Sequence, residues 1–409
     1  MSVNLDNIRD AQGILSGISQ VTPLLPDAKL SAELGSVHLK AECLQRSGSF
    51  KIRGAYNKIA SLTDEERAKG VIAASAGNHA QGVALAATLN GIKSVIVLPE
   101  FAPLTKVVAT RGFGAEVVLH GATFDEAVAH SRALQAEHGY TYVHAFDDEQ
   151  VIAGQGTIGV EMMDAMPELD VIVVPIGGGG IISGIATAVK AIKPNVRVIG
   201  VQAANVSAIK RSLANGSPLT VESQPTIADG IAVKRPGDLT LEIIRRLVDD
   251  VVEVTEEEIA HGIFHCVTNS HLVVEGAGAA GVAALLAGKV SVKPTDKVAT
   301  VLCGGNIDGN LLARILEQVL VRQGRYVIFK LLVLDRPGTL AEMLNHIAET
   351  GANVVEVFHQ RAVWLAPLGR VGIEVILEVR DETHTNEVQQ HLENCGYHVE
   401  RHFHKPWTE

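Results

Sequence analysis

The chain has 409 residues, 47% hydrophobic and 20% charged, a composition typical of a soluble globular protein with two or three domains. Its formal net charge of -11 and pI near 5.8 argue against nucleic acid or an anionic membrane as a partner. These bulk properties direct the search for function to a small-molecule site.

The cysteines and the N-terminus predict a cytoplasmic protein. The four cysteines are Cys43, Cys266, Cys303 and Cys395. They are widely spaced without CxxC pairing, so free thiols in a reducing compartment are expected. The first residues show no basic region followed by an apolar run, so no secretory signal is expected. Residues 171–189 carry no charge, but Pro175 and the glycines that follow it favour strand, loop and helix over a membrane span.

Short β-branched runs alternate with alanine-rich stretches of helical period along most of the chain. The predicted strands are residues 71–74, 94–98, 116–119, 171–174, 196–201 and 298–302, and the predicted helices include residues 79–89, 124–137 and 182–192. This alternation predicts an α/β fold with parallel sheets buried on both faces. Ligands of such sheets bind in loops beyond the carboxyl ends of strands, which is where glycine-rich segments fall here.

The pattern changes near residue 324. The order becomes strand 327–334, helix 339–350, strands 353–359 and 372–379, helix 384–395 and strand 398–403. This βαββαβ order is that of a ferredoxin-like module. We therefore predict a catalytic domain of residues 1–322, with a small subdomain of roughly 40–148 inserted in it, and a separate domain of residues 325–409.

Lys51 lies in a small, mostly uncharged stretch, between Phe50 and Ile52. These neighbours and the backbone would remove hydration from the ammonium group, lower its pKa and leave an amine nucleophile. The biological aldehyde that needs such a lysine is pyridoxal phosphate. For this segment alone, a lysine that snorkels at the start of an amphipathic helix of residues 51–62 is the alternative.

A glycine run follows the strand of residues 171–174 and opens a helix. Its members are Gly177, Gly178, Gly179 and Gly180. With no side chains between the backbone N–H groups and a ligand, and with the positive potential of a helix start, the run predicts a phosphate site.

The segment after strand 71–74 also opens a helix. It begins Ser75, Ala76, Gly77, Asn78 and His79. Its N–H groups suit a carboxylate and the Asn78 amide suits a ring oxygen, whereas the alternative is a helix that Ser75 caps. We expect His79 to be structural, because no nucleophile pairs with it. In a third glycine-rich strand end, residues 300–306, Cys303 either packs as a small apolar residue or touches a cofactor ring.

Together these segments resemble the fold type II pyridoxal-phosphate enzymes, the tryptophan synthase β-like group, and most closely the threonine dehydratase branch of the serine/threonine dehydratases. The resemblance covers roughly the first 320 residues and rests on residues 22–24, 48–54, 75–82, 177–180, 275–278 and 303–306.

The resemblance implies a role for each matching residue. Lys51 would bind the cofactor aldehyde covalently beside Phe50, the glycine run would hold the phosphate, and Asn78 would bond the ring hydroxyl. Glu275 would also line the cofactor site, and Cys303 would face the ring nitrogen. A thiol there does not keep that nitrogen protonated as a carboxylate does, which favours elimination over a long-lived carbanion.

The implied reaction is deamination of L-threonine to 2-oxobutanoate and ammonia, and of L-serine to pyruvate, in isoleucine biosynthesis or threonine catabolism. The runner-up is a serine racemase, serine dehydratase or hydroxyaspartate dehydratase. Racemases carry a serine as second base where this chain has Ala76, and acidic metal ligands where it has Gln202 and Ala208. Elimination without a divalent metal is therefore expected, with activation by a monovalent cation left open.

The C-terminal module resembles an ACT domain, with residues 334–340 as its first strand-to-helix turn. Such modules pair and bind amino acids at the interface, which implies an effector such as isoleucine or valine and a homodimer or homotetramer. Many modules of this fold bind nothing, so the effector rests on the resemblance.

Three other interpretations were open. Residues 154–159 spell GxGxxG and would suit an NAD-dependent oxidoreductase, but the strand expected at residues 141–146 does not run directly into them, so helix packing is expected. His398, His402 and His404 alternate on the last strand and could bind a metal, although a solvated strand face is expected. The third interpretation is an amino-acid sensor with an inert catalytic half. It is disfavoured because Lys51, Asn78 and the glycine run are all present.

Overall fold

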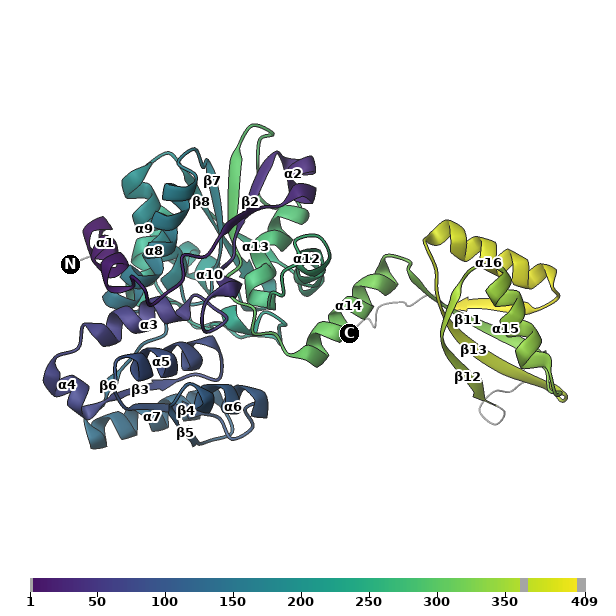
Figure 1. Cartoon of the computed structure of the whole chain (residues 1–409), viewed down its shortest axis with the longest axis horizontal. Coiled ribbons are helices and arrows are strands. Elements are labelled where there is room, and N and C mark those ends of the chain that lie inside the picture. The colour runs from purple at the N-terminus through teal and green to yellow at the C-terminus, as the bar shows by residue number, and fades with distance from the viewer. Residues whose placement is uncertain (1–2, 361–366, 403–409) are drawn as a thin grey trace. The chain divides into compact units, whose positions relative to one another are not determined.

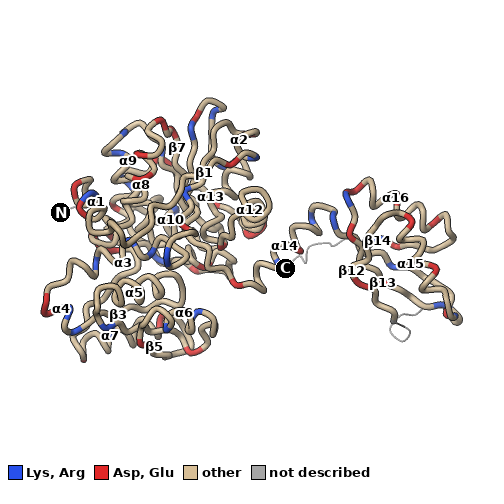
Figure 2. The backbone as a smooth tube through the Cα atoms, in the orientation of Figure 1, with Lys and Arg blue, Asp and Glu red and all other residues tan. Residues whose placement is uncertain are grey.

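The computed structural model describes residues 3–360 and 367–402, and the chain forms two compact units, Met1–Asp308 and Gly309–Glu409 (Figure 1). Each unit has a hydrophobic core of its own. Basic and acidic residues are interspersed along both units (Figure 2). No helix in the described ranges is long and apolar enough to cross a membrane. The uncharged residues 171–189 instead form β7 (Val171–Pro175) and most of α9 (Gly180–Ile192).

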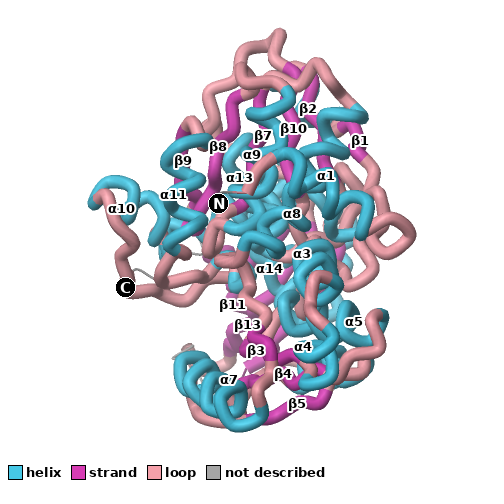
Figure 3. Tube along the Cα trace, turned by 90° about the vertical axis from the view of Figure 1, so that its left-hand side faces the viewer, coloured by secondary structure: helices cyan, strands magenta, loops and turns pink. Residues whose placement is uncertain are grey.

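The first unit is built around a six-stranded sheet in the order β1-β2-β10-β7-β8-β9, which Figure 3 shows across its upper half. The pair β1 and β2 is antiparallel, and the other neighbours are parallel. Besides β7, the strands are β1 (Leu24–Pro26), β2 (Ser36–Lys40), β8 (Arg197–Ala203), β9 (Asp250–Val254) and β10 (Lys297–Val301). Every residue of β7 is buried, which explains its unbroken Val and Ile content.

A second, fully parallel sheet of the first unit has the order β5-β4-β3-β6. Its strands are β3 (Val71–Ala74), β4 (Ser94–Leu98), β5 (Glu116–Leu119) and β6 (Thr141–Tyr142). The sheet and its helices fall within the small subdomain of roughly 40–148 expected from the sequence.

Helices flank both sheets, and many of them begin at polar caps. They are α1 (Leu5–Ile14), α2 (Ala28–Leu34), α3 (Lys51–Ala60), α4 (Asp64–Lys69), α5 (Asn78–Leu89), α6 (Leu104–Gly112), α7 (Phe124–His138), α8 (Glu149–Ala165), α10 (Ala208–Asn215), α11 (Asp238–Leu247), α12 (Glu256–Thr268) and α13 (Gly276–Leu286). For example, Thr123 and Glu126 form a capping box on α7, and the Asp148 carboxylate accepts hydrogen bonds from two N–H groups of α8.

The predicted α/β alternation is confirmed, and the predicted strands and helices of this unit, apart from the strand at residues 141–146, lie within two residues of their observed ends. The strand predicted at residues 141–146 is observed only as the short β6, and the pattern did not predict β1, β2 and β9. β1 is only three residues long, and β2 and β9 carry charged or polar residues among their apolar ones, so none of the three has the pattern of a buried run.

The second unit combines α14 (Gly309–Arg322) with a four-stranded antiparallel sheet in the order β12-β13-β11-β14. Its other elements are β11 (Tyr326–Leu334), α15 (Thr339–Glu349), β12 (Asn353–Gln360), β13 (Arg370–Glu378), α16 (Glu382–Asn394) and β14 (His398–His402). This is the predicted ferredoxin-like topology; residue 403 of the predicted last strand lies outside the described residues. The boundary between the compact units precedes α14, whereas the sequence assigned this helix to the first domain.

A buried ion network fixes the start of α3. The Arg53 guanidinium is fully buried and donates to Glu42 at 2.8 and 2.9 Å and to Glu161 at 2.6 and 2.9 Å. Lys40 Nζ of β2 also donates to Glu161, at 2.5 Å, and to the Thr22 carbonyl at 2.7 Å. Burial alone would raise the pKa of Glu42, but the charge and hydrogen bonds of Arg53, together with Lys40 and Thr22, outweigh burial and hold that pKa below its usual value. The network thus joins β2, α3 and α8 through paired charges.

Replacing Glu161→Ala should destabilise the first unit by about 3–5 kcal/mol, because Arg53 and Lys40 would remain buried without a full set of counter-charges. Urea unfolding should be followed by circular dichroism, because both tryptophans, Trp364 and Trp407, belong to the second unit. The control is Glu65→Ala, which removes an exposed pair with Lys69 and should leave the urea midpoint almost unchanged. Equal losses in the two variants would contradict the importance of the buried network.

Candidate active site

Lys51 is the first residue of α3, and its side chain is half-buried. Its Nζ donates a hydrogen bond of 3.0 Å to the Ala145 carbonyl and lies 5.0 Å from the centroid of the Phe50 ring. Loss of hydration lowers the pKa of Lys51 to about 8, although Cys303 and Glu275 act in the opposite direction. A sizeable fraction of this amine is therefore neutral near physiological pH, as the sequence setting predicts.

Glycine allows α5 to pack against the start of α3. A Cβ on Gly82 would lie 3.0 Å from both the carbonyl carbon and the Cβ of Lys51. Such a distance is shorter than ordinary van der Waals contact, so Gly82 permits the close approach of the two helices.

The glycine run lies between β7 and α9, and all four of its residues are buried. A Cβ on Gly178 would lie 2.4 Å from the Phe146 ring, and Gly179 has a φ of +101°, so neither position suits a side chain. Among the described residues, the N–H groups of this run find no hydrogen-bond acceptor. Buried N–H groups without acceptors at a helix start fit a bound phosphate, since each needs a partner.

Asn78 is held from both sides of its amide. Its Nδ2 donates to Glu275 Oε1 at 2.7 Å, and its Oδ1 accepts from Asn306 Nδ2 at 2.8 Å. Asn306 also donates to the carbonyl of Ser47, at 2.9 Å, in the segment that leads to Lys51. The four segments that carry these residues therefore meet at one place.

The position of Asn306 was not recognised as functional from the sequence, although it closes the third glycine-rich strand end. A Cβ on Gly48 would lie 2.2 Å from Asn306 Oδ1, and Gly48 has a φ of +69°, so a glycine there lets the amide approach. Gly48 is the local sequence signal for a close contact at this point, but the sequence does not show that Asn306 makes the contact.

Glu275 precedes α13 and is buried beside Gly304. A Cβ on Gly304 would lie 2.5 Å from Glu275 Oε1. Burial and, to a smaller extent, Asp229 raise the pKa of Glu275 to about 7, although the Asn78 hydrogen bond acts in the opposite direction. The nearby Cys303 is 4% exposed, and burial raises the pKa of its thiol well above the usual value. Cys303 is therefore a neutral thiol, and its carbonyl accepts from Phe50 N–H at 3.2 Å.

The loop after β3 gives His79 the structural role expected of it. His79 Nε2 lies 2.9 Å from the Val143 carbonyl, and burial lowers the pKa of the imidazole to about 3. The hydroxyl of Ser75 accepts from Gly77 N–H at 3.2 Å, and Gly77 rather than Ser75 occupies the N-cap of α5. Ala76 lies in the same loop and is partly exposed.

The GxGxxG segment is a helix-packing motif, as expected. It lies within α8, where a Cβ on Gly154 would be 2.7 Å from the Arg53 carbonyl and one on Gly156 would be 2.9 Å from the Gly184 carbonyl. A dinucleotide site needs such glycines in a loop between strand and helix. These glycines instead bring α3, α8 and α9 together.

No cluster of three potential metal ligands occurs within the described ranges. Of the three alternating histidines, His404 lies outside those ranges. The four cysteines are free thiols, and three of them are buried.

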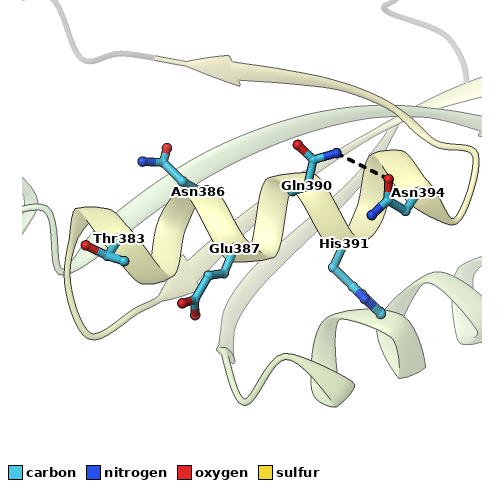
Figure 4. Close-up of a pocket in the computed structure, with 6 residues that line it drawn as sticks. All are labelled: Thr383, Asn386, Glu387, Gln390, His391 and Asn394. Atoms are coloured by element: carbon cyan, nitrogen blue, oxygen red, sulfur yellow. Dashed lines mark hydrogen bonds between the residues drawn. The ribbon is translucent and has the colours of Figure 1, made fainter.

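The second unit carries a hollow of about 530 Å³ on α16 (Figure 4). Its lining is Thr383, Asn386, Glu387, Gln390, His391 and Asn394. These side chains come from one helix face and are polar. They do not include any of the residues expected to carry chemistry.

Comparisons with known proteins agree with this geometry. A family model described as "Pyridoxal-phosphate dependent enzyme" matches residues 15–304. The L-threonine ammonia-lyase of Thermotoga maritima is 50% identical over 398 residues, which are 97% of this chain and 99% of that protein. The catabolic L-threonine dehydratase TdcB of Escherichia coli K12 is 46% identical over 318 residues, 77% of this chain and 96% of its own length.

Solved structures show the same likeness. Maize serine racemase aligns with a TM-score of 0.74 and 37% identity, covering 79% of this chain and 99% of that one. The processed form of threonine deaminase isoform 2 from Solanum lycopersicum aligns with a TM-score of 0.74 and 35% identity, covering 78% of this chain and 91% of that one. The chain therefore belongs to the family of pyridoxal-phosphate dependent enzymes, with the fold type II architecture in its first unit.

Proposed function

We propose that this chain is an L-threonine ammonia-lyase that converts L-threonine to 2-oxobutanoate and ammonia and also deaminates L-serine to pyruvate. The observation that carries the proposal is the 50% identity to a named L-threonine ammonia-lyase across 97% of the chain. The lowered pKa of Lys51, and a glycine run that fits a phosphate and packs on the residue next to Lys51's partner Ala145, support it.

When bound, pyridoxal phosphate withdraws electrons from the amino acid and makes its Cα proton acidic. The glycine run would hold the phosphate through its N–H groups, and Phe50 would line the site beside Lys51. Asn78, fixed between Glu275 and Asn306, would present its amide to the ring hydroxyl. The loop of residues 75–79 would bind the substrate carboxylate through its N–H groups, since a helix start favours an anion.

The proton transfers follow from the same residues. Lys51, held near the Ala145 carbonyl, would take the Cα proton as a neutral amine. The β-hydroxyl leaves as water after receiving a proton. The enamine that is released is then hydrolysed to the oxo acid and ammonia. Cys303, a neutral thiol, supplies no carboxylate partner for the ring nitrogen, so elimination should follow proton removal closely.

Serine racemisation is the second candidate, because maize serine racemase shares 37% identity and the fold. Racemisation needs a second base on the opposite face of the substrate. The loop here has Ala76 where the racemase branch is expected to have serine, so elimination is favoured. Hydroxyaspartate dehydration would use the same elimination on a more acidic substrate.

The second unit is proposed as a regulatory, ACT-like domain that binds isoleucine or valine. Residues 325–409 contain the ferredoxin-like sheet, and residues 334–340 form its first strand-to-helix turn. The matched 318 residues are 96% of the Escherichia coli protein, so a relative of that length has little counterpart of this unit. We further propose a cytoplasmic homodimer or homotetramer, with a monovalent cation as an activator, serving isoleucine biosynthesis or threonine catabolism.

Purified protein should release 2-oxobutanoate from L-threonine, and Lys51→Ala should abolish both this activity and the visible absorbance of bound cofactor. Oxo acids are measured by reduction coupled to NADH, and chiral chromatography follows the serine that remains when L-serine is the substrate. A Lys51→Ala variant with full turnover would contradict the role of this lysine. Substantial D-serine would favour racemisation over the interpretation of Ala76.

The uptake of pyridoxal phosphate by cofactor-free protein should rise about tenfold per pH unit below pH 8 and level off above it, because only the neutral Lys51 amine attacks an aldehyde. Stopped-flow absorbance between pH 6 and 10.5 measures the midpoint. Glu275→Gln should lower that midpoint, since the Glu275 carboxylate raises the pKa of Lys51. A midpoint near 10.5, that of an ordinary lysine, would contradict the desolvated site.

Removing the residues after 325 should leave threonine turnover within about twofold and abolish any response to isoleucine or valine, because the effector site would be lost while the family-matched segment remains. Initial rates with and without each amino acid measure the response of both proteins. A full-length enzyme that ignores both amino acids would refute the regulatory proposal.

A further inference from the structure

Thr240, in the first turn of α11, contacts the glycine run through a buried hydroxyl. The residue is fully buried, and its Oγ1 donates a hydrogen bond of 2.7 Å to the Gly178 carbonyl. A second, longer contact of 3.3 Å joins the hydroxyl to the carbonyl of Gly237. A Cβ on Gly179 would lie 2.8 Å from the Thr240 Cβ, so the side chain touches both residues of the 178–179 peptide.

This contact sets the direction of an N–H group. The 178–179 peptide is trans, so the Gly178 carbonyl and the Gly179 N–H point in opposite directions. The carbonyl is held toward α11 by the short hydrogen bond from Thr240 and by a longer one of 3.4 Å from the Gly237 N–H, so the Gly179 N–H points away from α11. Rotation of this peptide would replace an N–H donor by a carbonyl oxygen, which repels an anion. The φ of +101° at Gly179 is part of the conformation that the hydroxyl holds.

Thr240 is itself fixed by Asp147. The Asp147 carboxylate accepts hydrogen bonds of 3.1 Å from the N–H groups of Thr240 and Asp238, at the start of α11. Thr240 also accepts, through its carbonyl, a 3.3 Å hydrogen bond from the Ser183 hydroxyl of α9. The hydroxyl of Thr240 is therefore held at a defined distance from the glycine run by the segment that carries Asp147 and by α9.

We propose that Thr240 is a positioning residue that locks the 178–179 peptide so that the Gly179 N–H faces the cofactor phosphate. The inference rests on the proposed phosphate role of the glycine run and adds a residue that acts through it. It requires that the hydroxyl of Thr240, rather than its bulk, determines how tightly a phosphate is held.

Binding of two aldehydes to cofactor-free, full-length protein tests this role. Pyridoxal phosphate and pyridoxal differ by the phosphate, so the ratio of their dissociation constants isolates the contribution of the glycine run. Thr240→Val keeps the shape but loses the hydroxyl, and should weaken pyridoxal phosphate binding about tenfold while pyridoxal binding changes less than about twofold. Thr240→Ser retains the hydroxyl and should restore the wild-type ratio. If the valine variant does not fold, Thr240→Ala gives the same comparison.

The matched control is Thr187→Val. Thr187 is also buried, and its hydroxyl donates at 2.8 Å to the Ser183 carbonyl within α9, away from the glycine run. Its ratio should equal that of the wild type. The inference is overturned if Thr240→Val leaves the ratio of the two dissociation constants unchanged, including the case in which both aldehydes bind more weakly by the same factor. It is also overturned if Thr240→Ser loses the preference for the phosphate. A wild-type chain without any phosphate preference would instead contradict the proposed phosphate role of the glycine run.

Discussion

The buried charge network around Arg53 is the constraint on which the candidate site depends. Arg53 lies two residues after Lys51 in α3, so the ion pairs that fix its guanidinium also fix the start of that helix. Burying two cations and two carboxylates has a large desolvation cost, which only close, complete pairing offsets. A small rotation of α3 would break several of these contacts at once. The main effect of the network is therefore to favour one position of the Lys51 amine, because the free energy of ion pairing is largely offset by the desolvation cost.

Glycines let the other helices come close enough to share this constraint. Gly82 brings α5 against Lys51, and Gly54 of α3 packs against Gln155 of α8, where a Cβ would lie 2.3 Å from the Gln155 amide. Gly154 meets the Arg53 carbonyl from the other helix. Side chains at these positions would push α3 away from the loops that carry Asn78 and the glycine run. The abundance of glycine in this chain thus reflects packing as well as ligand binding.

The sequence predicted the parts of the site that are local. Lys51 and the glycine run are recognisable from a few adjacent residues, and strand–helix alternation placed the glycine run at the end of a strand. Asn306, Asp147 and Thr240 were not predicted, because each acts through contacts with segments distant in sequence. The same limit applies to the fold. Buried strands such as β7 are recognised from an unbroken run of apolar residues. In β2, apolar residues alternate with polar ones, and the partner of Lys40, Glu161, lies over a hundred residues away in the sequence.

One short segment connects these distant contacts. The Ala145 carbonyl accepts from Lys51, the Phe146 ring packs on Gly178, and the Asp147 carboxylate holds the start of α11. Three consecutive residues thus touch the amine, the glycine run and the helix that orients it. Because the three contacts come from consecutive residues, a displacement of this segment would disturb the amine and the glycine run together. The separation between the amine and the glycine run must match the span of the cofactor from aldehyde to phosphate, and a single rigid segment is a direct way to maintain it.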